Sequence, residues 1–105
     1  MNSFAEHVTA DRRLVVLRLL EQAPDYRGNA YLLQRALDGF GHAVGMDRLD
    51  TDLAWLAEQD LLKLEAVGGV SIATLTQRGA DVAHGRVVVP GLSLIHISEP
   101  TRLLS

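Results

Sequence analysis

The chain has 105 residues, of which 48 % are hydrophobic and 22 % are charged, and its formal net charge is −3 at pH 7. This composition indicates one small globular domain, and the absence of cysteine excludes disulfides and thiolate metal sites. No apolar run reaches the roughly 18 residues of a membrane span, and the N-terminus lacks the basic-then-apolar order of a signal peptide, so we expect a cytoplasmic protein without a membrane partner.

The first predicted helix runs from about Asp11 to Ala23, with Thr9 or Asp11 as its cap. Pro24 ends it because proline cannot continue a helix, and "PDYRGN" is predicted as a turn. Its apolar stripe consists of side chains at helical spacing, namely Leu14, Val16, Leu17, Leu19 and Leu20.

The second helix is predicted from Ala30 to Phe40, with Asn29 as its cap. The glycines of "GFGHAVG" then break the helix and permit a tight reversal. The side chains that we expect this helix to bury are Leu32, Leu33, Ala36, Leu37 and Phe40.

The third helix is predicted from about Met46 to Gln59. One side of its helical wheel is apolar and comprises Met46, Leu49, Leu53, Leu56 and Ala57. The opposite side carries Asp47, Arg48, Thr51, Trp55 and Glu58.

Two β-prone runs follow in "LLKLEAVGGVSIATL". Gly68 and Gly69 suit a two-residue hairpin turn that pairs Val67 with Val70, because both glycines can take positive φ. In that register one face carries Leu62, Leu64, Ala66, Ala73 and Leu75. A last short helix is predicted after Thr76, its cap, and "RVVVPG" is predicted as an extended exit.

Two motifs carry a resemblance to the winged helix-turn-helix superfamily. Its third helix often reads Leu-x-x-Leu-x-x-x-Gly-Leu-Val, and here the matching residues are Leu53, Leu56, Leu61 and Leu62. Asp60 stands where the superfamily has glycine, a departure that Asp tolerates because it can adopt the left-handed conformation. The Leu-Thr-x-x-Gly sequence that follows the wing is matched by Leu75, Thr76 and Gly79.

Residues 26–91 more closely resemble the small ArsR-like proteins of Mu-like phages and prophages, through "YRGNAYLLQRAL", "DLAWLAEQDLL", "LTQRGADVAHGR" and "VPG". The resemblance implies a mainly α-helical winged helix-turn-helix domain with a small β-hairpin wing over residues 1–91. It also implies a transcriptional regulator that binds double-stranded DNA as a homodimer and acts by occupying its site.

In the superfamily the third helix enters the major groove and the wing contacts the backbone. Mapped onto this chain, the groove-facing residues are Asp47, Arg48, Thr51 and Trp55. The residues placed to hold phosphates are Arg27, Asn29 and Lys63.

The charge of the third helix argues against a phosphate-binding surface. Residues 46–60 contain one arginine and five acidic residues, a charge of −4, and phosphates repel such a helix. DNA binding then requires that other basic residues cluster on one face of the domain. The candidates are Arg12, Arg13, Arg18, Arg27 and Arg35. The alternative is that these arginines only form solvated helix faces. The competing functional hypothesis is a protein-protein interaction module on the same fold, used in phage assembly or packaging.

Trp55 lies opposite the leucines on the wheel, so it is either an interface aromatic or packs on the wing strands near Val67 or Ile72. No catalytic motif is found, and we expect no enzyme and no cofactor. Metal sensing, the other ArsR-family activity, is not expected either, because cysteine is absent and the histidines are scattered.

The last segment, "LSLIHISEPTRLLS", differs from everything before it. Residues 92–102 back-translate without a mismatch to sequence that resembles the adapter DNA of transposon-based sequencing libraries. We therefore expect residues 92–105 to be a foreign tail, excluded from the fold, with the native sequence beyond Gly91 missing. The alternative is a genuine C-terminal strand over "LSLIHI".

Overall fold

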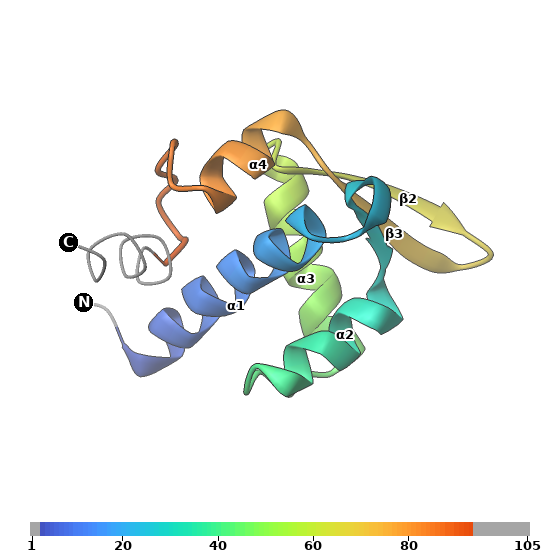
Figure 1. Cartoon of the computed structure of the whole chain (residues 1–105). Helices are drawn as coiled ribbons and strands as arrows, with labels where there is room; N and C mark the ends of the chain where they lie inside the picture. The colour runs from blue at the N-terminus through green and yellow to red at the C-terminus, as the bar shows by residue number, and fades with distance from the viewer. Residues whose placement is uncertain (1–2, 94–105) are drawn as a thin grey trace.

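The computed structural model describes residues 3–93. In chain order its elements are α1 (Phe4–Glu21), the 3-10 turn η1 (Pro24–Tyr26), β1 (Arg27–Asn29), α2 (Ala30–Gly39), α3 (Met46–Glu58), β2 (Leu62–Val67), β3 (Val70–Leu75) and α4 (Gln77–Ala83). Figure 1 shows the helices packed together, with the β2–β3 hairpin projecting from one end as a wing. This arrangement confirms the predicted winged-helix fold. No helix within residues 3–93 is long and apolar enough to cross a membrane.

The predicted start of α1 was wrong, because the helix begins seven residues earlier, at Phe4. Ser3 caps it in a reciprocal pair with Glu6: the Glu6 N–H donates to Ser3 Oγ at 3.2 Å, and the Ser3 N–H donates to Glu6 Oε1 at 2.8 Å. This first part of α1 escaped prediction because it buries little, with Phe4 82 % exposed, so it carries no apolar stripe.

Replacing Ser3 by alanine is expected to lower the free energy of unfolding by about 1 kcal/mol, because a first-turn N–H loses its acceptor. Thr9→Ala is the matched control, since Thr9 was a predicted cap but lies inside α1. Thermal melts followed by circular dichroism measure both changes. A Ser3→Ala variant that melts at the wild-type temperature would refute the cap at Ser3.

The segment predicted as the turn "PDYRGN" contains a strand. Asp25 and Tyr26 take left-handed φ values of 56° and 57°, which reverse the chain. Residues 27–29 then pair antiparallel with β3, giving the strand order β1-β3-β2. A strand of three residues is too short to show a period-2 pattern in the sequence. These residues form a strand only because they pair with β3, which is distant in the chain.

Asn29 caps α2 as predicted, with its Oδ1 accepting the Leu32 N–H at 2.9 Å. The predicted buried face of α2 was partly wrong. Leu33 and Leu37 are buried, but Leu32 is 58 % exposed and Phe40 61 % exposed. The buried stripe of α2 is narrower than its apolar stripe because neighbouring elements cover only one side of this helix.

The predicted hairpin is confirmed. Val67 pairs with Val70, and Gly68 and Gly69 have φ values of 59° and 81°. Thr76 caps α4 with Oγ1 accepting the Gly79 N–H at 2.9 Å. Asp60, the residue in place of the usual glycine, adopts the left-handed conformation at φ 64°.

The segment after α4 turns back onto the core instead of leaving as an extended exit. Val89 and Leu92 are buried, and the Ser93 N–H donates to the Ala10 carbonyl at 3.2 Å. Leu92 and Ser93, which the adapter resemblance assigns to a foreign tail, therefore contact the domain. The rest of that predicted tail lies outside the described residues.

Candidate nucleic-acid interface

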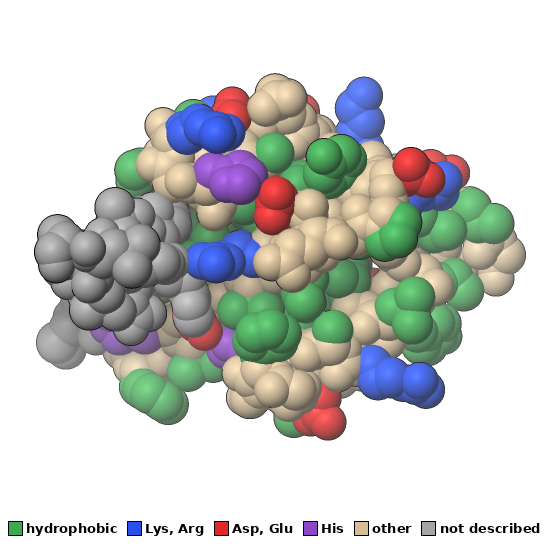
Figure 2. Space-filling view, in the orientation of Figure 1, with side chains coloured by type: hydrophobic (Ala, Val, Ile, Leu, Met, Phe, Trp, Pro, Cys, Tyr) green, Lys and Arg blue, Asp and Glu red, His purple; other side chains and the backbone are tan. Residues whose placement is uncertain are grey.

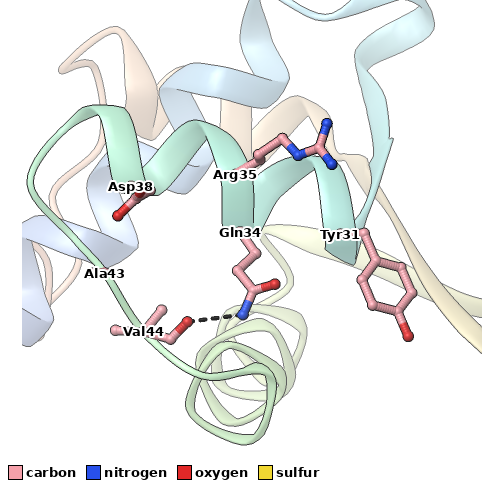
Figure 3. Close-up of a pocket in the computed structure, with 6 residues that line it drawn as sticks. All are labelled: Tyr31, Gln34, Arg35, Asp38, Ala43 and Val44. Carbon is pink, nitrogen blue, oxygen red and sulfur yellow. Dashed lines mark hydrogen bonds between the residues drawn. The ribbon is translucent and has the colours of Figure 1, made fainter.

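Helices α2 and α3 and the loop between them form the helix-turn-helix. Gln34 Nε2 donates to the Val44 carbonyl at 2.9 Å, which ties the loop to α2 (Figure 3). On the other side of the loop, His42 is buried and its Nε2 lies 2.7 Å from Asp11 Oδ2 of α1. These two polar contacts hold the start of α3 in place relative to α1 and α2.

The outward side of α3 carries three of the predicted groove-facing residues. Asp47, Arg48 and Thr51 are exposed, and the Thr51 hydroxyl donates to the Asp47 carbonyl at 3.0 Å. Asp47 lies in the first helical turn, where the helix dipole stabilises a carboxylate. Arg48 is thus the one cation on a side that also exposes Asp50 and Glu58.

The three-stranded sheet brings together two of the predicted phosphate-binding residues. Arg27 of β1 and Lys63 of β2 both pair with Thr74 of the central strand, so they share one row on one face of the sheet. The Arg27 guanidinium lies 3.7 Å from Glu65, and both side chains are largely exposed. Asn29 lies on the next strand position of that face, but its side-chain oxygen is occupied as the cap of α2.

Asp52 does not belong to the acidic surface that the sequence suggested. It is 1 % exposed, and its Oδ2 accepts a hydrogen bond from Arg12 Nε of α1, a residue that is itself 4 % exposed. Arg13 Nε lies 3.6 Å from the other carboxylate oxygen. With Asp52 internally neutralised, the exposed charges of residues 46–60 are one arginine and four acidic residues, or −3 in place of the predicted −4.

Of the two alternatives for Trp55, packing on the wing strands is not the arrangement that the structure shows. The ring is half-buried against α1 and the exit segment: the Arg13 guanidinium stacks 3.9 Å from its centroid, and Arg13 Nη1 donates to the Gly91 carbonyl at 3.3 Å. Burial lowers the pKa of Arg13, and the Asp52 carboxylate opposes that shift. Trp55 therefore presents only part of its ring to a ligand, and no spacing along the chain signals its contact with Gly91.

These contacts also change the set of available cations. Arg12 and Arg13 are engaged inside the fold and cannot hold a duplex. Within residues 3–93, Arg35, Arg48 and Lys63 form no ion pair. On the face in Figure 2 the basic side chains stand apart from one another and make no continuous stripe. No group of three or more His, Asp or Glu side chains in this part of the chain is placed to hold a metal.

The fold and the exposed α3 and wing define a winged-helix protein. More particularly, the chain belongs to the family of gp26, an uncharacterized protein of Escherichia phage Mu, with 45 % identity over 85 residues, covering 81 % of this chain and 88 % of gp26. A Haemophilus influenzae protein, also uncharacterized, is 44 % identical over 77 residues, covering 72 % of this chain and 74 % of its own length. The predicted kinship with a Mu-like phage protein is thereby confirmed. No family model matches the chain.

Among solved structures, the apo form of the C30AH42A mutant of Lactococcus lactis ZitR is similar to this chain. The TM-score is 0.59 at 20 % identity, with 96 % of this chain covered. The chain spans 64 % of the length of that ZitR chain. At this identity the likeness establishes the fold.

Proposed function

We propose that this protein binds double-stranded DNA and regulates transcription in a phage or prophage by occupying its site, without catalysis and in the cytoplasm. The observation that carries the proposal is the row Arg27–Thr74–Lys63 on the sheet, together with the exposed Arg48 near the start of α3. Adjacent strands lie about 4.8 Å apart, so the two cationic residues start about 10 Å from each other. Both can contact one phosphate backbone while α3 lies in the groove.

The roles of the residues follow from their positions. Arg27 and Lys63 bind phosphates, and so fix the orientation of the domain without reading sequence. Arg48 and Thr51 reach base edges from the exposed side of α3. Asp47 accepts from a cytosine amine, and Trp55, which Arg13 covers in part, contacts the duplex only through its exposed portion.

A salt-dependent titration against random and phage-derived duplexes tests the proposal. Lys63→Ala is expected to weaken binding to all sequences alike and to reduce the slope of log affinity against log salt by about 1. Arg48→Ala is expected to cost about 1–3 kcal/mol of preference for the best duplex. Arg86→Ala is the control, because Arg86 follows α4 and belongs to none of the proposed DNA contacts. Its Nη1 lies 3.3 Å from Asp81 Oδ1. Absence of binding at low salt by the folded protein would refute DNA binding.

A second candidate function is a protein-interaction module. The observation that favours it is the acidic outward side of α3, where Asp47, Asp50 and Glu58 are exposed and phosphates are repelled. The variant Asp50→Lys discriminates between the two functions. It is expected to strengthen duplex binding if α3 approaches DNA, because a repulsion becomes an attraction. A duplex affinity unchanged by Asp50→Lys would mean that this side of α3 faces something other than DNA.

A further inference from the structure

Helix α2 exposes an apolar stripe that the domain itself leaves uncovered. The stripe consists of Leu32, Ala36 and Phe40, which follow one another at intervals of four residues and so lie along one line of the helix. Leu32 is 58 % exposed and Phe40 61 % exposed, whereas Leu33 and Leu37 of the same helix are buried. Large exposed apolar side chains in a row on one helix mark an interaction surface more than scattered ones do.

The stripe continues onto α1. A shallow hollow beside Phe40 is lined by Val15, Arg18, Leu19 and Gln22, so the apolar surface spans the border of two helices. Figure 2 shows hydrophobic side chains gathered over α2 and along its border with α1. The loop contact of Gln34 lies on another side of α2, so the stripe does not face α3.

We infer that this stripe is the contact between two copies of the chain, with the two α2 helices antiparallel about a two-fold axis at Ala36. The order of side chains is large, small, large, and it is symmetric about Ala36. A two-fold axis there places Leu32 of each copy next to Phe40 of the other and lets the helices approach at the two alanines. The same patch is then complementary to itself, which a two-fold contact requires.

The size of the patch sets the strength of the dimer. Helix α2 has 10 residues and is therefore about 15 Å long. Together with the adjoining side of α1, the footprint is well below the roughly 800 Å² per partner of a standard interface. The dimer is accordingly weak and concentration-dependent, and two adjacent half-sites on one duplex would stabilise it. The inference rests on the proposed function, because a protein that binds two half-sites on one duplex does so as a dimer. The dimer itself can be tested without DNA.

Analytical ultracentrifugation of the full chain tests the interface. Leu32→Glu and Phe40→Glu are each expected to raise the dimer dissociation constant about tenfold or more, because each variant places a carboxylate in a contact that is apolar in the wild type. The matched control is Tyr31→Glu, since Tyr31 is 59 % exposed on the same helix but points away from the stripe. A wild-type chain that stays monomeric at millimolar concentration, or a dimer indifferent to both stripe variants, would overturn the inference.

The absence of cysteine permits a second measurement. Helices packed 8–10 Å apart bring the two Ala36 Cα atoms to about 4–5 Å, which lies within disulfide range. Ala36→Cys is therefore expected to form a covalent dimer under mild oxidation much faster than Tyr31→Cys. Equal rates for the two variants would contradict a two-fold axis at Ala36. Loss of DNA binding alone would refute the proposed function and leave this result unchanged.

Discussion

Replacing Asp52 by alanine is expected to lower the free energy of unfolding by about 3–5 kcal/mol, because a buried guanidinium then loses its counter-charge. Asp52 and Arg12 are 1 % and 4 % exposed, so water cannot replace the lost partner without opening the core between α1 and α3. Arg13 loses an ionic contact at the same time. Since a domain of this size has about 5–15 kcal/mol of stability in total, the variant should be close to unfolding.

Asp50→Ala is the matched control for that variant, because Asp50 is exposed two residues away on the same helix. Its cost is expected to lie within about 0.5 kcal/mol. Urea unfolding followed by Trp55 fluorescence measures both, since the ring lies against Arg13, which also approaches Asp52. The double variant Arg12→Leu with Asp52→Ala should recover part of the loss, because the buried Arg12 guanidinium is then removed together with its partner, while Arg13 still lacks its ionic contact. Equal costs for Asp50→Ala and Asp52→Ala would refute the buried pair.

Gly79→Ala is expected to destabilise the protein by about 3 kcal/mol or more, because there is no space for a methyl group. A Cβ at Gly79 would lie 2.2 Å from the Leu61 carbonyl oxygen and 2.7 Å from Leu75 Cδ1. The carbonyl cannot simply move, since it also accepts the Thr76 N–H at 3.1 Å. The glycine of the Leu-Thr-x-x-Gly motif is therefore needed for the close approach of α4 to the start of the wing.

Gly39→Ala is the control for the packing of Gly79, because a Cβ at Gly39 meets nothing within 4 Å. Alanine at that helical position is expected to leave stability unchanged or to raise it by up to about 1 kcal/mol. Chemical unfolding of both variants, with the same probe, compares them directly. A loss for Gly79→Ala of under about 1 kcal/mol would show that α4 shifts easily on the wing.

The resemblance to the winged-helix superfamily predicted the fold. The structure shows which turn and which helix cap the residues of its motifs form. Asp60 occupies the left-handed position of the missing glycine, and Thr76 is the cap of α4. Both are local requirements of turn and cap geometry, which short stretches of sequence express directly. The candidate DNA-binding residues came from the same resemblance, and of these the structure brings Arg27 and Lys63 onto one row of the sheet.

Local pattern was enough to define α2, α3, the hairpin register and the caps of α2 and α4, because periodicity, turn glycines and capping side chains act over a few residues. Contacts between distant residues decided the rest. Asp52 is buried and not part of the acidic surface, because Arg12, 40 residues earlier in the chain, pairs with it in the core. The Trp55 ring packs against Arg13 and Gly91 and not against the wing strands. Leu32 and Phe40 stayed exposed because neighbouring helices cover only one side of α2, a limit that depends on how the helices pack.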